Sequence, residues 1–230
     1  MVSAIIPAYN EESTIGEAVK AVVGHPRIEE VIVVDDGSKD GTSRIAAQAG
    51  AKVIRLSENS GKANAMEIGV KAAKSDIILF LDADVLGMTY EKLSVIIDPV
   101  VSGRLDMHVG IFARPLVFSK KLFYISPVLS GQRALVKSLW YKIPANHKKG
   151  FRIELALNYA ARRYGKGTGY EIVPSLRHFS KEEKYGFFKG FWRRLRMFSQ
   201  VAAFSLVLYI WEPMKAPFAS VGEASKEGRA

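Results

Sequence analysis

Residues 77–84 read Ile-Ile-Leu-Phe-Leu-Asp-Ala-Asp, a run of apolar residues followed by two carboxylates one position apart. A short apolar run of this kind is typical of a buried strand in a parallel sheet. Two carboxylates just past its end can both reach one hard cation, and oxygen ligands suit Mg²⁺ or Mn²⁺. The stretch therefore predicts a strand over 77–81, with Asp82 and Asp84 as candidate metal ligands.

Strand and helix patterns alternate along the first half of the chain. The predicted strands are 2–7, 30–34, 52–56, 77–81 and 107–112, and the predicted helices are 12–23, 41–49, 62–73 and 90–101. This alternation implies an α/β fold with a mostly parallel, doubly wound sheet and helices on both faces. Ligands of such sheets bind beyond the carboxyl ends of the strands.

Three of these strands end in polar segments. The segments are Pro7-Ala8-Tyr9-Asn10-Glu11, Asp35-Asp36-Gly37-Ser38 and Asp82-Ala83-Asp84. Because the carboxyl ends of parallel strands meet at one edge of a sheet, we expect all three segments to converge there. A carboxylate after the second strand can accept a hydrogen bond from a nucleobase or a ribose, and either Asp35 or Asp36 instead closes the turn.

The alternation weakens after residue 113. Ser130-Gly131-Gln132-Arg133 is predicted to be a turn or a helix start, 151–164 a helix and 171–173 a strand. A long helix is predicted over 186–211 and a loose tail over 212–230. Aromatic and basic residues alternate along the long helix, which is typical of contact with an anionic membrane surface. Packing on the sheet or on a partner chain is the alternative.

The charge and composition of the chain narrow its partners. The net charge is +10, and the segment from Arg133 to Gln200 holds sixteen Lys and Arg against four Asp and Glu, so this part of the chain favours an anionic partner. Cys is absent, which excludes a disulfide, a zinc-thiolate site and a cysteine nucleophile. No leader is visible, and the longest uncharged stretch, Met197 to Trp211, is shorter than a membrane span. We expect a cytoplasmic protein, peripheral at the inner face of the membrane.

The three polar segments, taken in order, resemble the signatures of the GT-A family 2 glycosyltransferases. The resemblance covers roughly the first 115 residues and implies a Rossmann-like GT-A sheet that binds a nucleotide sugar. It implies that Asp82 and Asp84 hold the metal and the diphosphate, with Asp84 also counted as catalytic. The residues implied at the nucleoside are Pro7, Ala8, Tyr9 and Glu11, with Asp35 or Asp36 at the base.

Two later segments extend the predicted site. Gly61-Lys62-Ala63-Asn64-Ala65 opens a helix with a glycine and a lysine, which favours a phosphate, so Lys62 is a candidate diphosphate contact. Ser130-Gly131-Gln132-Arg133-Ala134-Leu135 resembles a segment of dolichyl- or polyprenyl-phosphate sugar synthases, and Arg133 is a candidate nucleotide-sugar contact. Glu154 follows at the position where relatives carry the general base, and a helix-surface role is the alternative.

Arg177-His178 follows the last predicted strand. Several GT-A enzymes carry a histidine in a comparable position, so the resemblance implies that His178 completes the metal shell and that Arg177 steadies the diphosphate. We expect a catalytic domain over 1–180, with a nucleotide-sugar half (1–115) and an acceptor half (116–180), followed by a helix over 181–211.

The expected function is metal-dependent transfer of a sugar from a UDP- or GDP-sugar to a membrane-associated lipid phosphate or glycan. A soluble enzyme acting on a small phosphorylated acid such as 3-phosphoglycerate is the alternative. A nucleotidyltransferase would carry a glycine-rich loop after the first strand, where this chain has Pro7-Ala8-Tyr9-Asn10-Glu11. A nucleic-acid-binding module would leave the aligned carboxylates unexplained, so no nucleic acid is expected.

Overall fold

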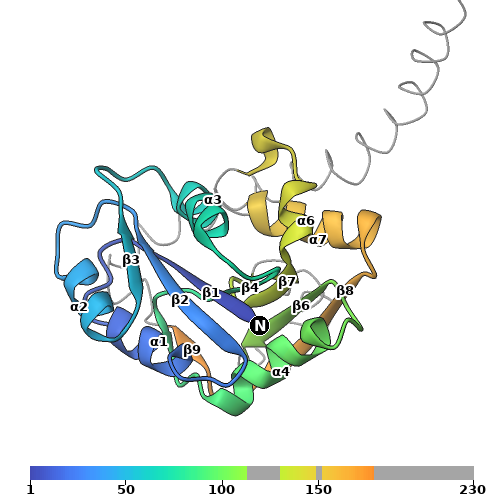
Figure 1. Ribbon diagram of the computed structural model, residues 1–230, viewed down its shortest axis with the longest axis horizontal. Helices are drawn as coiled ribbons and strands as arrows, with labels where there is room; N and C mark the ends of the chain where they lie inside the picture. Colours follow the sequence, from blue (N-terminus) through green and yellow to red (C-terminus); the bar gives the residue numbers. More distant parts are fainter. Residues whose placement is uncertain (113–129, 149–151, 179–230) are drawn as a thin grey trace, which may run out of the picture.

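The computed structural model describes residues 1–112, 130–148 and 152–178 (Figure 1). Its strands are β1 (Val2–Ala8), β2 (Ile28–Asp35), β3 (Lys52–Arg55), β4 (Ile77–Phe80), β5 (Val85–Leu86), β6 (Met107–Phe112), β7 (Arg133–Val136), β8 (Thr168–Val173) and β9 (Arg177–His178). Its helices are α1 (Ile15–Val22), α2 (Thr42–Gln48), α3 (Lys62–Ala72), α4 (Tyr90–Val101), α6 (Lys137–Tyr141), the short 3-10 helix η2 (Ala145–His147) and α7 (Arg152–Tyr164).

The main sheet has the strand order β3-β2-β1-β4-β7-β6-β8. Strands β3, β2, β1 and β4 are parallel to one another, β7 runs antiparallel to both β4 and β6, and β8 is parallel to β6. A second, two-stranded sheet pairs β5 with β9. The predicted α/β fold with a mostly parallel sheet is confirmed, and the carboxyl ends of β2, β1 and β4 lie side by side.

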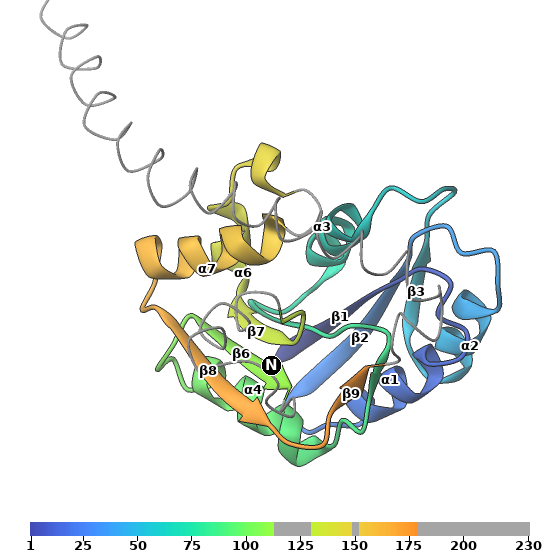
Figure 2. The same cartoon turned by 180° about the vertical axis from the view of Figure 1, so that it is seen from behind.

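Helices cover both faces of the main sheet (Figures 1 and 2). Side chains alternate along β1, so that Ala4 and Ile6 pack with α1, α2 and α4, whereas Ile5 packs with α3, α6 and α7. On α1 the buried residues recur at spacings of three and four, as in an amphipathic helix. Each face therefore has its own apolar core, and the fully buried central strands hold the edge of the sheet in place.

Close packing between α3 and β1 depends on a glycine. A Cβ atom on Gly69 would lie 2.4 Å from Cγ2 of Ile5, inside the core. Gly69→Ala is therefore expected to lower the free energy of unfolding by about 1–3 kcal/mol through overpacking. Gly16→Ala, on α1, is the matched control, because its Cβ would meet only Cγ2 of Ile45, at 3.1 Å. Urea denaturation of both variants checks this, and equal stabilities would contradict the packing argument.

The structure corrects the prediction for residues 130–133. Arg133 begins strand β7 and does not begin a helix or close a turn. The reason is long-range pairing, since β7 fills the space between β4 and β6, whose residues lie far away in the sequence. Arg133 is paired with Phe80 on β4 and with Val109 on β6, and no local sequence pattern predicts this pairing.

The remaining predictions fare differently. The helix over 151–164 is confirmed as α7 and the strand over 171–173 as β8, which begins earlier, at Thr168. The helix predicted over 186–211, within the segment 181–211, and the tail over 212–230 lie outside the described residues. Among the helices that the structure describes, none is both long and apolar enough to cross a bilayer. The division at residue 115 stays a prediction, and strands from both halves share one sheet.

Candidate functional site

The first two polar segments are tied together at the carboxyl ends of β1 and β2. The amide of Asn10 donates to Oγ of Ser38 at 2.9 Å, and the amide of Lys39 donates back to Oδ1 of Asn10 at 2.9 Å. The amide of Glu11 donates to Oγ1 of Thr42 at 2.8 Å. Asn10 adopts a positive φ of 54°, a conformation that Asn tolerates better than most residues. These bonds fix the shape of the loop that follows β1.

Asp35 and Asp36 are both buried and both hold loops in place. Oδ1 of Asp35 accepts from the amide of Ser38 at 2.9 Å and so closes the turn after β2. Oδ1 of Asp36 accepts from the amide and the hydroxyl of Ser60, and its Oδ2 accepts from the amide of Gly61, each at 2.8 Å. Asp36 thereby anchors the loop that leads into α3, and a contact with the base stays a prediction for both carboxylates.

The other residues predicted at the nucleoside lie along the end of β1. Pro7 is half-buried, Ala8 is buried and Glu11 is half-buried. Tyr9 exposes 41% of its surface, which is high for a large aromatic residue. An exposed ring at the carboxyl edge of the sheet is available to a planar ligand.

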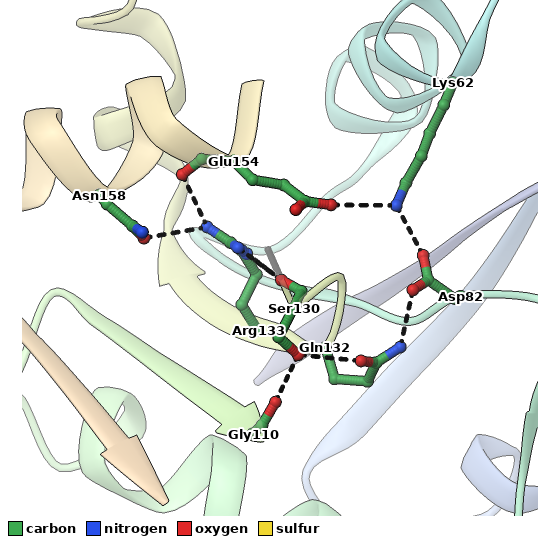
Figure 3. A network of polar contacts seen from close by, with 8 residues as sticks. All are labelled: Lys62, Asp82, Gly110, Ser130, Gln132, Arg133, Glu154 and Asn158. Atoms are coloured by element: carbon green, nitrogen blue, oxygen red, sulfur yellow. Dashed lines mark hydrogen bonds and ion pairs between the residues drawn. The ribbon is translucent and has the colours of Figure 1, made fainter. Parts of the chain in front are cut away.

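Lys62, at the first position of α3, joins carboxylates from two distant elements (Figure 3). Its Nζ lies 2.7 Å from Oδ1 of Asp82, past the end of β4, and 3.3 Å from Oε1 of Glu154, on α7. Desolvation alone would lower the pKa of Lys62, but the charges of the two carboxylates outweigh it and raise that pKa above its ordinary value. The ammonium therefore stays charged between two anions at the edge of the sheet.

Glu154 does not lie on the helix surface, which was the alternative left open by the sequence. It is 5% exposed and points from α7 toward Lys62 (Figure 3). Its Oε2 is buried and has no hydrogen-bond partner among the residues that the structure describes. A buried oxygen of this kind is costly unless a ligand or a water molecule bonds to it. The assignment of Glu154 as a general base stays a prediction.

Gln132 is a site residue that the sequence did not single out. Its Nε2 donates to Oδ2 of Asp82 at 2.9 Å, and the side chain is completely buried. The backbone of Gly131 lies against the same carboxylate, since a Cβ there would be 2.2 Å from Oδ2. The sequence pattern that drew attention to this segment includes Gly131 and Arg133 but leaves position 132 unspecified, so it did not single out Gln132.

Arg133 lies behind the site, not at its surface. It is fully buried, with Nε donating to the carbonyl of Ser130 at 3.1 Å and Nη1 donating to the carbonyl of Glu154 at 3.3 Å and to Oδ1 of Asn158 at 3.2 Å. Burial lowers the pKa of Arg133 and the charge of Glu154 opposes that shift, while arginine itself stays protonated. The guanidinium thus ties β7 to α7, and its predicted contact with a nucleotide sugar stays a prediction.

Strand pairing brings the backbone near Asp84 next to that of His178, two of the predicted metal ligands. Asp84 directly precedes β5, and in β5 Val85 pairs with His178 and Leu86 pairs with Arg177. In the described part of the chain, no cluster of three or more His, Cys, Asp or Glu side chains is arranged to hold a metal ion. Mg²⁺ is commonly held by one or two carboxylates together with substrate phosphates. The pair Asp82 and Asp84 fits that mode of binding, and the three-residue set stays a prediction.

Taken together, the fold and the site define an α/β protein with a cation and several carboxylates at the carboxyl edge of a parallel sheet. The chain belongs to glycosyl transferase family 2, whose family model matches residues 3–155. Membership of this family, inferred from the three polar segments, is confirmed.

Curated relatives match parts of the chain. An uncharacterized protein of Methanocaldococcus jannaschii is 38% identical over 110 residues, which cover 46% of this chain and 44% of the relative. The 4,4'-diaponeurosporenoate glycosyltransferase of Staphylococcus haemolyticus is 39% identical over 90 residues, which cover 36% of this chain and 24% of the relative. The chain thus spans less than half the length of these curated relatives.

Solved structures share the fold. Glucosyl-3-phosphoglycerate synthase from Mycobacterium tuberculosis, in complex with Mn²⁺, UDP-glucose and glycerol 3-phosphate, superposes with a TM-score of 0.74 at 21% identity, covering 90% of this chain and 79% of that one. Another structure of the synthase gives a TM-score of 0.66 at 24% identity, over 78% and 73% of the two chains. At this identity the likeness establishes the fold, and the predicted Rossmann-like GT-A architecture is confirmed.

Proposed function

We propose that this protein is a glycosyltransferase that moves a sugar from a nucleoside-diphosphate sugar to an acceptor bearing a phosphate. The observation that carries the proposal is Lys62, held between Asp82 and Glu154 at the carboxyl edge of the sheet. A charged ammonium at a helix N-terminus is suited to a diphosphate, and the carboxylates beside it are suited to a divalent cation.

The residues divide the work of donor binding. Tyr9, with its exposed ring, offers a face on which a nucleobase can stack. Asp82 and Asp84 would hold Mg²⁺ or Mn²⁺, which when bound neutralises charge on the diphosphate. Lys62 donates to the diphosphate and opposes the charge that develops as the sugar departs. Arg177, whose backbone pairs with Leu86 close to Asp84, is the second candidate cation for that role.

Glu154 takes the sugar side of the site. Its buried Oε2 can accept a hydrogen bond from a hydroxyl group of the sugar nucleotide or of the acceptor substrate. If the attacking group is a hydroxyl, Glu154 removes its proton as a general base. If the attacking group is an ionised phosphate, no base is required, and Glu154 orients the sugar.

Donor binding is tested by the thermal stability of the protein with UDP, GDP and their sugar conjugates, each with Mn²⁺ or Mg²⁺ and without metal. We expect one nucleotide to raise the melting temperature in a metal-dependent way, and Asp84→Ala to lose that increase. Asp76→Ala is the matched control, because Asp76 is an exposed aspartate just before the opposite end of β4. Stabilisation by no nucleotide, or equal stabilisation without metal, would contradict the proposal.

The acceptor is tested by incubating the stabilising sugar nucleotide with 3-phosphoglycerate, with glycerol 3-phosphate and with a polyprenyl phosphate in detergent. The structural similarity to a synthase solved with UDP-glucose and glycerol 3-phosphate supports a small phosphorylated acceptor. The basic helix predicted over 186–211 supports a lipid phosphate at the inner membrane face. Product formed with one class alone assigns the acceptor, and release of the free sugar alone with every acceptor would exclude both classes.

A further inference from the structure

The carboxylate of Asp82 is contacted by residues 131 and 132, which precede β7 and have no role in the proposed function so far (Figure 3). We propose that Gly131 and Gln132 are positioning residues that hold Asp82 in a single orientation for the donor and its metal. This inference rests on the proposed function and adds two residues to the machinery of that site.

Gly131 is required by a close approach and not by its backbone conformation. A Cβ at this position would lie 2.2 Å from Oδ2 and 2.4 Å from Oδ1 of Asp82, closer than real Cβ contacts come. Its φ lies outside the positive range that favours glycine, so an alanine would suit the backbone. The group that would have to move is the carboxylate. A side chain at position 131 is therefore expected to disturb Asp82 more than it disturbs the fold.

Gln132 holds Asp82 from the other direction of the same loop. The carboxylate only accepts hydrogen bonds, so the amide must present its Nε2 at 2.9 Å and its Oε1 away from Asp82. The hydroxyl of Ser130 has one proton and lies near two acceptors, 3.0 Å from Oε1 of Gln132 and 2.5 Å from the carbonyl oxygen of Gly110. The amide of Gly110 donates in turn to the carbonyl of Gln132 at 2.9 Å. Gln132, which donates to Asp82, is thus anchored to strand β6 at Gly110.

Lys62 and Gln132 bind Asp82 in different ways. Lys62 contacts Oδ1 from a side chain that is 39% exposed, and a diphosphate can attract its ammonium away. Gln132 contacts Oδ2 of Asp82 from a completely buried position, so a bound ligand is not expected to draw its side chain away. Once Lys62 turns to the sugar nucleotide, Gln132 and the backbone of Gly131 still restrain the carboxylate. This is why positioning is assigned to them and not to Lys62.

The first test measures the affinity for the stabilising nucleotide, UDP or GDP, with Mn²⁺ by isothermal titration. Gly131→Ala and Gln132→Leu are each expected to weaken binding about tenfold, while circular dichroism shows both variants folded. Gln48→Leu, at an exposed position of α2, is the matched control and is expected to bind as the wild type does. A role in folding alone would lower the melting temperature and leave the affinity of the folded protein unchanged.

A double-mutant cycle in urea, without ligand, tests whether the two residues act through Asp82. In an Asp82→Ala background, Gly131→Ala no longer meets a carboxylate and Gln132→Leu no longer removes a hydrogen bond to it. We therefore expect neither substitution to lower the free energy of unfolding further than Asp82→Ala does alone. Additive losses in the free energy of unfolding, or an unchanged nucleotide affinity in both single variants, would overturn the positioning role. The proposed function would remain intact in that case, as long as the wild-type protein binds the nucleotide. A wild type that binds no nucleotide with metal would instead overturn the proposed function, and the positioning role with it.

Discussion

Lys62→Met is expected to weaken the binding of a nucleoside diphosphate about 100-fold and to strengthen the binding of Mn²⁺ alone several-fold. The two effects have opposite signs because the ammonium pairs with the carboxylates when the site is empty and with the diphosphate when the nucleotide is bound. Without a donor it lies 2.7 Å from Asp82 and 3.3 Å from Glu154, where it repels a second cation. With a donor it supplies a charge-assisted hydrogen bond to the diphosphate. Met keeps the length of the side chain and removes the charge.

Isothermal titration with nucleotide and Mn²⁺, and electron paramagnetic resonance of free Mn²⁺ without nucleotide, measure the two affinities separately. Lys71→Met is the matched control, because Lys71 lies on the same helix, pairs with Glu67 at 3.4 Å and is 66% exposed. It should change neither affinity. A fall in both affinities for Lys62→Met would indicate damage to α3, and no change in either would remove Lys62 from the site.

The part of the site built on parallel strands could be predicted from the sequence. Segments that follow β1, β2 and β4 must meet at one edge once those strands are neighbours, so the convergence of Asn10, Asp35 and Asp82 follows from the alternation of elements. Lys62 was also predictable, because a glycine and a lysine at a helix start are a local pattern. In both cases a local signal and a general rule of topology agree.

The part of the site that depends on β7 could not be predicted in this way. In β7 only three apolar residues follow the buried Arg133, which is too short a run to identify a strand, and the place of β7 between β4 and β6 is set by long-range pairing. Gln132 enters the site only because that pairing brings residues 130–132 against Asp82. Arg133 was predicted at the ligand for the same reason, since sequence shows that an arginine is near the site but not which way it points.

Arg133→Met is expected to lower the free energy of unfolding by about 3–5 kcal/mol. The guanidinium is fully buried, and it satisfies the carbonyls of Ser130 and Glu154 and the side chain of Asn158. Met fills much of the volume but donates nothing, so three buried acceptors lose their donor and the carboxylate of Glu154 loses a compensating charge. Arg133→Lys keeps the charge but not the planar guanidinium group, so its free energy of unfolding should lie between those of the wild type and Arg133→Met.

Urea denaturation of Arg133→Met is compared with that of Arg163→Met, an exposed arginine in the last turn of α7, which should change stability by less than about 0.5 kcal/mol. The nucleotide affinity of the folded protein distinguishes a structural role of Arg133 in the buried network from a direct contact with the nucleotide sugar. Because its donors face the interior, a loss of stability should dominate, with any loss of affinity following from movement of Glu154. Wild-type stability with lost affinity would mean that Arg133 reaches the donor, as the sequence alone suggested, and that the buried network is replaceable.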